Sequence, residues 1–199
     1  SGMWTANTMN CLTEACGLGL PGNGTIPAVF AQRIWLAKQA GRQVLELLSK
    51  GIRARDILTP EALRNTFVMD MAMGGSTNSV LHMLSIANEA RIPFPIEELN
   101  TIRAGTPQLA KLAPASNYHI EDFYYAGGVQ ALASRITDLL DTSVMTATGR
   151  TLAENLESAR VWNDDVIRPR SNPYRETGGL TILYGNPAPD SAAGKSGAV

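Results

Sequence analysis

Apolar residues recur at helical spacing along most of the chain, and turn residues separate the runs. The first run predicts a helix over residues 5–18, which glycines at its end, beginning with Gly17, are expected to stop. A longer helix is predicted from Pro27, a residue suited to the first helical position, to Gly51. The residues predicted to form one apolar face of this longer helix are Phe30, Ile34, Ala37, Val44, Leu45 and Leu48.

The middle of the chain predicts two helices joined by a glycine doublet. Thr59 and Pro60 are the residue types of an N-cap and a first helical position, so a helix is expected to begin there. Gly74–Gly75 is expected to break it, and Ser76–Asn78 to cap the next helix. The predicted buried stripe of that next helix is Val80, Leu81, Leu84 and Ala87.

The pattern in the second half is less regular. A short helix is expected over 96–103, and a longer one over 122–140 that is interrupted at Gly127–Gly128. Thr151 and Glu154 have the spacing of a capping box, which predicts a short helix to about residue 160.

The composition changes towards the C-terminus, where 168–178 is expected to be an extended linker. Leu180–Tyr184 is the best strand candidate, with no sheet partner expected within the chain. Pro187 and the small residues 192–194 should weaken any strand after it. Residues from 168 onward are therefore expected to be mobile in the isolated chain, or ordered only by pairing with another copy. The fold class is α/β but mainly helical.

Composition and charge exclude several classes of protein. Of the 199 residues, 44% are hydrophobic and 18% are charged, which is enough apolar material for a core and excludes a disordered chain. The net charge of -1 gives no electrostatic footprint for nucleic acid or an anionic membrane. The most apolar stretch, 67–87, is interrupted by Asp70 and the polar run 74–78, so it cannot cross a bilayer as one helix. We expect a soluble globular protein, or a piece of one, without a secretory signal.

The residues that could carry chemistry on their own are few. Cys11 and Cys16 would lie about 140° apart around one helix, and with His82 and His119 they give no metal-ligand spacing, so both are expected to be small core residues. His82 is interpreted as an ordinary helix side chain, and His119 is a weak candidate for a base oriented by its acidic neighbours. Lys195, in a tail rich in glycine and alanine, is expected to be solvated.

Two glycine-rich segments, 20–25 and 74–78, are harder to interpret. Glycines allow a backbone to approach a ligand closely, and the N–H groups of a following helix can hold an anion. For 20–25 a tight connection is the favoured interpretation, and for 74–78 a helix–helix turn with an N-cap. From the residues alone, both interpretations stay open.

Six motifs together resemble the dihydroxy-acid dehydratase family, which also contains phosphogluconate and other sugar-acid dehydratases. They occur in the family's order along almost the whole chain: Gly2–Ala15, Leu20–Thr25, Met73–His82, Ala126–Val129, Thr148–Leu152, and Gly178–Leu180 with Gly185–Asn186. Family members are roughly three times this length. The chain therefore resembles a central slice of such an enzyme.

The resemblance implies a domain organisation. Residues 1–167 would belong to the large N-terminal α/β domain, 168–178 would be a linker, and 179–199 would start the C-terminal β-rich domain. It also implies that Met3, Thr5, Asn7 and the segment Gly74–Asn78 lie near the wall of the active site. That last segment comprises Gly74, Gly75, Ser76, Thr77 and Asn78.

The activity implied is the dehydration of a 2,3-dihydroxy-3-methyl carboxylic acid to a 2-keto acid in valine and isoleucine biosynthesis. The cofactors implied for the intact enzyme are an iron–sulfur cluster and Mg²⁺, and neither is expected to bind this fragment alone. The intact enzyme is expected to be a homodimer. In the family a cluster cysteine stands just before the residues that match Ser1–Met3, so the fragment is expected to be inactive. The enzyme would be cytoplasmic in a bacterium and organellar in a eukaryote. The alternatives are a fragment of a sugar-acid dehydratase and a non-catalytic binding or oligomerisation domain.

Overall fold

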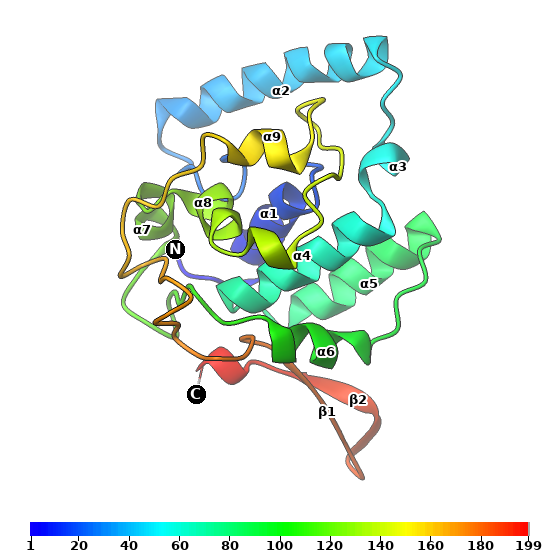
Figure 1. The fold of residues 1–199 in the computed structure, drawn as a ribbon, viewed down its shortest axis with the longest axis vertical. Coiled ribbons are helices and arrows are strands. Elements are labelled where there is room, and N and C mark those ends of the chain that lie inside the picture. Colours follow the sequence, from blue (N-terminus) through cyan, green and yellow to red (C-terminus); the bar gives the residue numbers. More distant parts are fainter. Residues whose placement is uncertain (199) are drawn as a thin grey trace.

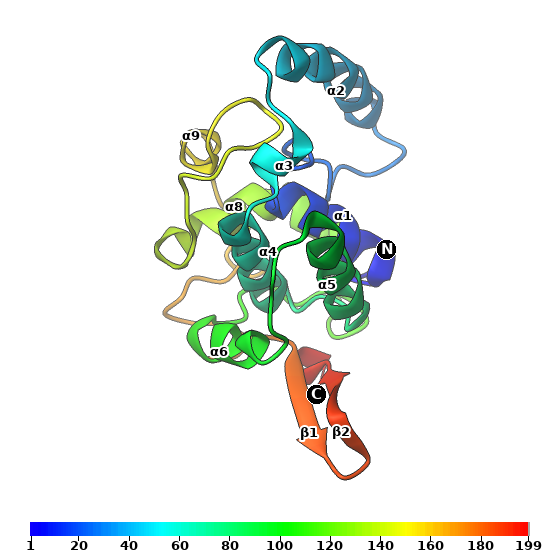
Figure 2. The same ribbon diagram turned by 90° about the vertical axis from the view of Figure 1, so that its right-hand side faces the viewer.

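A computed structural model describes residues 1–198, and in it the chain is mainly helical around one central helix (Figures 1 and 2). That helix is α4, Pro60–Met73, which packs against α1 (Thr5–Ala15), α5 (Asn78–Ala90), α6 (Glu98–Gly105) and α8 (Gly128–Ser134). Residues on every side of α4 are buried, so it forms the centre of the main hydrophobic core.

The ends of α4 follow the local chemistry that its sequence predicts. The Thr59 hydroxyl accepts a hydrogen bond from the Ala62 N–H, and Pro60 occupies the first helical position. At the other end Gly74 adopts a left-handed conformation with φ of 63°, which stops the helix. The next helix, α5, buries Val80 and Ala87 as expected, but the prediction for Leu81 is wrong because that side chain is 65% exposed.

The remaining short elements follow the sequence pattern only in part: the predicted ones differ in length, and the pattern gives no helix at Ala54–Ile57 or at Ser196–Ala198. The region predicted as one interrupted helix forms separate pieces, broken at Gly127 with a φ of 112°. The capping box at Thr151 and Glu154 is present, although its helix already ends at Leu156. The elements concerned are α3 (Ala54–Ile57), α7 (Ile120–Tyr125), the 3₁₀ turn η1 (Thr137–Leu139), α9 (Leu152–Leu156) and the 3₁₀ turn η2 (Ser196–Ala198).

The longest helix, α2 (Ala31–Ser49), lies along one side of the molecule and away from the core (Figure 2). None of its 19 residues, all of which the structure describes, is buried. Leu36 and Leu47 pack only partly, against a small cluster around Ile57. The periodicity of the sequence predicts an apolar face on this helix but does not show whether other residues cover it. In the structure much of that face is exposed: Ile34, Val44, Leu45 and Leu48 have 61% to 76% of their surface accessible.

The C-terminal segment corrects the expectation of an unpaired strand. Strand β1 (Thr181–Gly185) pairs antiparallel with β2 (Ala188–Gly194), with Leu183 opposite Ala192. Pro187 lies in the turn of this hairpin, where the ladder needs no N–H donor, so it does not disrupt the pairing. The hairpin projects from the helical body next to α6 (Figures 1 and 2).

The segment that leads to the hairpin lies against the helical body. The Arg168 N–H donates to the Leu109 carbonyl at 2.8 Å, and the Gly179 N–H donates to the Met71 carbonyl at 3.0 Å. Leu180 and Ile182 are buried in the main core. The backbone of this predicted linker is therefore hydrogen-bonded to the body.

Among the described residues, no helix is both long enough and apolar enough to span a bilayer.

Candidate functional site

The first turn of α1 meets the joint between α4 and α5. The Thr5 and Ser76 hydroxyl oxygens lie 3.2 Å apart, and the Asn78 amide donates to the Thr5 hydroxyl at 2.7 Å. The Ser76 N–H donates to the Thr8 hydroxyl at 3.1 Å. These hydrogen bonds join two segments about 70 positions apart in the sequence. Together they form a partly exposed polar surface, with Thr77 beside it.

The residues before α1 are held by a separate set of hydrogen bonds. The Asn7 amide donates to the Gly2 carbonyl at 2.6 Å and to the Ser1 hydroxyl at 2.8 Å. Met3 is buried, and its N–H donates to the Ala113 carbonyl at 2.8 Å. Thr5, Ser76 and Asn78 are thus joined by hydrogen bonds. Asn7 instead contacts the segment before α1, and Met3 packs in the core.

The glycine doublet is needed for close packing. A Cβ atom at Gly75 would overlap the Asp70 carboxylate oxygen Oδ1 and would lie 2.8 Å from Thr8 Cγ2. At Gly74 the left-handed backbone itself disfavours a side chain. The turn interpretation of this segment therefore accounts for both glycines.

Sequence reasoning missed Asp70, which lies directly beneath the doublet. Its side chain is fully buried, and the Ser79 hydroxyl donates to its Oδ2. Oδ1 has no hydrogen-bond partner among the described residues. Burial raises the pKa of Asp70 to about 7, against the opposite effects of the Ser79 hydrogen bond and the positive charge of Lys195. A single acid inside the apolar run of α4 was the available signal.

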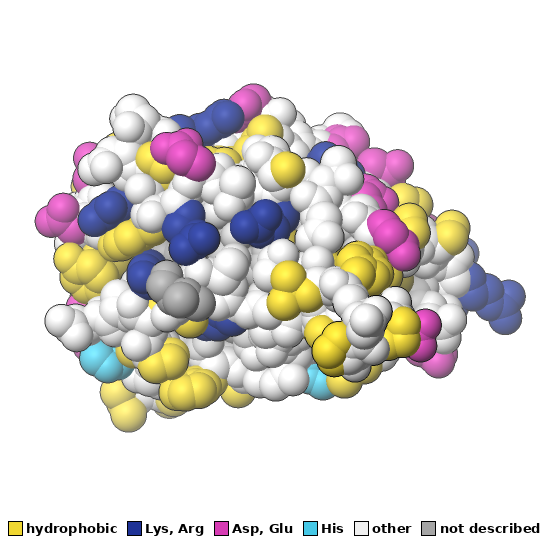
Figure 3. Space-filling view, turned by 90° about the horizontal axis from the view of Figure 1, so that it is seen from below, with side chains coloured by type: hydrophobic (Ala, Val, Ile, Leu, Met, Phe, Trp, Pro, Cys, Tyr) yellow, Lys and Arg dark blue, Asp and Glu magenta, His cyan; other side chains and the backbone are white. Residues whose placement is uncertain are grey.

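Lys195 is not the solvated residue that its surroundings in the sequence suggested. Its side chain is half-buried, and its ammonium group donates to the Met3 carbonyl at 3.5 Å. Burial lowers the pKa of Lys195, and the charge of Asp70 acts in the opposite direction. Viewed from below, lysine and arginine side chains gather near the middle of the face beside the C-terminus, and most acidic side chains lie towards its edge (Figure 3).

The other glycine-rich segment, 20–25, folds around a carboxylate of this chain. The Gly24 N–H donates to Glu14 Oε2 at 2.9 Å, and the Gln130 amide donates to Glu14 Oε1 at 3.1 Å. Burial raises the pKa of Glu14. A Cβ at Gly24 would lie 2.6 Å from Cys11 Cα. The segment is therefore a tight connection whose N–H group binds Glu14.

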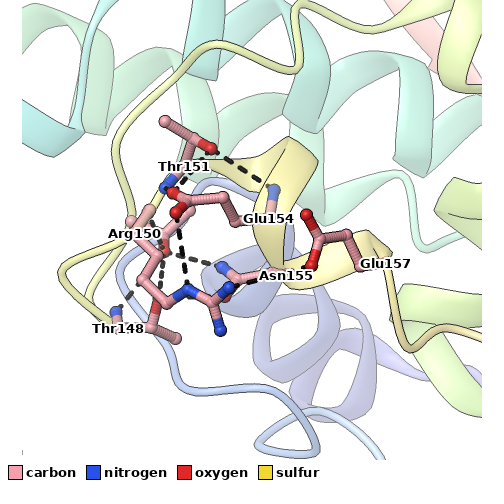
Figure 4. Close-up of polar contacts among 7 residues, drawn as sticks. Thr148, Arg150, Thr151, Glu154, Asn155 and Glu157 are labelled. Atoms are coloured by element: carbon pink, nitrogen blue, oxygen red, sulfur yellow. Dashed lines mark hydrogen bonds and ion pairs between the residues drawn. The ribbon is translucent and has the colours of Figure 1, made fainter.

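The motif around Thr148–Leu152 forms a polar cluster at the start of α9 (Figure 4). The Thr148 hydroxyl donates to the Asn155 side-chain oxygen at 3.0 Å, and the Thr151 N–H donates to Glu154 at 2.8 Å. Arg150 lies 3.7 Å from Glu154 and 3.9 Å from Glu157, which are loose and exposed ion pairs. These contacts hold the turn and cap the helix.

The two cysteines and two histidines do not form a metal centre. The buried thiols of Cys11 and Cys16 donate to the carbonyls of Gly24 and Thr13, and burial raises both pKa values. His82 is exposed on α5, and His119 lies at the start of α7 with its ring 3.9 Å from Asp122. Residues 1–198 contain no group of three Cys, His, Asp or Glu side chains that could hold a metal ion. They fit neither an iron–sulfur cluster nor Mg²⁺.

Asp70 gives a testable pH dependence. Its pKa is raised in the folded state, so the fold retains the proton that the unfolded chain loses near pH 4. This contribution to stability is present at low pH and is lost as the pH rises from about 4 to about 7. Asp70→Asn resembles the protonated form. We expect the unfolding free energy of this variant, relative to the original, to increase over that interval in urea titrations. A constant difference between pH 4 and pH 8 would contradict the assignment.

Comparison of this sequence with those of known proteins identifies its family. Residues 1–155 match the family described as "Dihydroxy-acid/6-phosphogluconate dehydratase N-terminal". The chain thus belongs to the dihydroxy-acid/6-phosphogluconate dehydratase family. It is 55% identical over 201 aligned residues to a dihydroxy-acid dehydratase of Caldanaerobacter subterraneus subsp. tengcongensis and 56% identical to one of Caldicellulosiruptor bescii. Each alignment covers 100% of this chain and 36% of the relative, so the chain spans just over a third of their length.

Proposed function

We propose that the chain is part of a hydro-lyase that dehydrates 2,3-dihydroxy-3-methyl carboxylic acids to 2-keto acids in the biosynthesis of valine and isoleucine. The observation that carries the proposal is the identity of 55% and 56%, over the whole chain, to two proteins named dihydroxy-acid dehydratase. The hydrogen bonds that join Thr5, Ser76 and Asn78 on one polar surface support it.

The role of this chain in that reaction would be to shape the active site. Thr5, Ser76 and Asn78 present hydroxyl and amide groups that can bind the hydroxyl and carboxylate oxygens of a dihydroxy acid. Gly75, where a Cβ would lie 2.8 Å from Thr8 Cγ2, allows α1 to approach the joint of α4 and α5 closely. The cluster and the metal ion that the resemblance implies for the intact enzyme have no ligand set among residues 1–198. No step of the reaction can therefore be assigned to side chains described here.

The wider organisation is part of the same proposal. Residues 1–167 would form part of the N-terminal domain, 168–178 the connection, and 179–199 the start of a β-rich domain, in a homodimer. The close packing of the helices around α4 supports the first assignment, and the hairpin of β1 and β2 supports the third. Since the relatives quoted are bacterial, a cytoplasmic location is the one we propose.

The experiment that tests the function uses the longer polypeptide encoded by the same gene. It is purified anaerobically and supplied with 2,3-dihydroxy-3-methylbutanoate or 6-phosphogluconate, and the 2-keto product is quantified. We expect turnover of the branched dihydroxy acid. Exclusive turnover of the sugar acid would replace the proposal with the sugar-acid alternative, and no turnover of either would favour a non-catalytic domain.

A cofactor experiment on the 199-residue chain is a separate prediction. Two buried thiols with raised pKa values provide too few thiolate ligands, so we expect no stoichiometric iron–sulfur cluster after anaerobic reconstitution. Iron and sulfide analysis after gel filtration measures the outcome. One cluster retained per chain would contradict the prediction.

A further inference from the structure

A buried acid, Asp70, and a half-buried amine, Lys195, lie on two separate parts of the chain. Asp70 belongs to α4, and Lys195 lies between β2 and η2. The amine of Lys195 reaches the carbonyl of Met3, in the segment Ser1–Met3 that precedes α1. Neither residue was among those that the resemblance placed at the active site.

The backbone on both sides of Lys195 is fixed. Before it, β2 is paired with β1. After it, the Ser196 hydroxyl donates to the Gly178 carbonyl at 3.2 Å, and the Gly197 N–H donates to the Gly179 carbonyl at 2.9 Å. The lysine is thus anchored by its neighbours, and little backbone freedom has to be lost to direct its side chain towards Met3.

Asp70 is the acidic group that acts on this amine. The charge of each group shifts the pKa of the other towards the charged form, without a direct ion pair between them. Two other groups face Asp70, namely the Ser79 hydroxyl, which donates to it, and the Cys11 thiol, whose pKa is raised in part by the Asp70 charge. Lys195 is the only cation that acts on Asp70 among the described residues.

We propose that Lys195 is a positioning residue: its ammonium group fixes the Met3 carbonyl and so holds the segment Ser1–Met3 in place ahead of the first turn of α1. Met3 leads directly into the turn of α1 that carries Thr5, which bonds Ser76 and Asn78. The geometry of the polar surface therefore depends on a residue of the C-terminal segment. This inference stands whether or not the proposed function is correct.

Exchange of the Met3 amide hydrogen measures how firmly the segment is held. This N–H is bonded to the Ala113 carbonyl, so it exchanges with solvent only when Ser1–Met3 opens. We expect Lys195→Met to accelerate exchange at Met3 by about tenfold, which corresponds to the loss of one hydrogen bond from a charged donor. Lys195→Arg should retain most of the protection, since it keeps the charge. Lys38→Met, on the exposed surface of α2, is the matched control.

The pairing with Asp70 is tested by combining variants. Asp70→Asn alone should accelerate Met3 exchange, and it should add little in the Lys195→Met background because the carboxylate acts through the lysine. Full additivity of the two effects would overturn the coupling. Unchanged exchange at Met3 in Lys195→Met would overturn the positioning role. So would an equal acceleration across Val80–Ala87 in α5, since that would report only a loss of global stability.

A pH titration separates positioning from simple packing. The Asp70 carboxyl carbon, followed by ¹³C NMR, should titrate near pH 7 in the original protein. Lys195→Met removes the cation that favours the carboxylate, so the midpoint should move to higher pH. Lys38→Met should leave it in place. An unmoved midpoint in Lys195→Met would show that Asp70 does not act on Lys195, and the coupling between them would be overturned.

Discussion

Gly75→Val is expected to reduce the unfolding free energy of the chain by about 1–3 kcal/mol, through overpacking where α4 and α5 meet. The new Cβ would overlap Asp70 Oδ1 and contact Thr8 Cγ2 at 2.8 Å, and the carboxylate cannot withdraw into solvent because it is fully buried. In the longer enzyme the same change should displace Ser76 and abolish most of the activity. Urea denaturation of the 199-residue chain and turnover of the longer protein measure the two effects.

A matched control for this substitution exists within the same chain. Gly41 lies in the middle of α2, and apart from the adjacent backbone of that helix no atom lies within 4 Å of the position where its Cβ would be built. Gly41→Val adds the same side chain without a clash, and valine has a higher helix propensity than glycine. It should leave stability unchanged or slightly increased. Equal destabilisation by both substitutions would remove the evidence for a special packing requirement at Gly75.

Ile182→Ala is expected to cost about 2–5 kcal/mol, because the side chain is buried in the main core and its loss leaves a cavity. The backbone of Ile182 is also bound by the Asn100 side chain, which accepts from its N–H at 3.0 Å and donates to its carbonyl at 2.9 Å. These contacts hold the hairpin on α6. In the original protein, limited proteolysis should therefore spare residues 181–194, and the variant should be cleaved there first.

The neighbouring strand position provides the comparison for that experiment. Leu183 is 55% exposed, so Leu183→Ala should change stability by less than about 0.5 kcal/mol and leave the proteolysis pattern unchanged. Rapid cleavage of the original protein within the hairpin would instead support the expectation, based on sequence alone, that residues from 168 onward are mobile. Hydrogen exchange at the Ile182 amide distinguishes a hairpin held on the helical body, where exchange is slow, from a mobile segment, where it is fast.

Local sequence chemistry predicted the helices well, because caps and helix-breaking glycines act within a few residues. Thr59, Pro60 and Gly74 have the predicted roles at the ends of α4. The sequence does not predict the pairing of β1 with β2, because a proline inside a strand would remove a hydrogen-bond donor. In the structure Pro187 lies in the turn between the two strands. The polarity of a residue in the sequence does not show which distant groups surround it. Asp70 and Lys195, 125 positions apart, could therefore be connected only by the structure.

At the exposed positions of α2, selection for folding of the 199 residues can be distinguished from selection for contacts outside them. Substitutions of Ile34, Leu45 or Leu48 should be nearly neutral for the folding of the 199 residues, because none of these side chains enters the core. A mutational scan of the longer gene, selected for growth, would therefore register at these positions only constraints imposed from outside this segment. Intolerant positions would map a contact made elsewhere in the assembled protein, while tolerant positions would be free sites for labels or surface redesign.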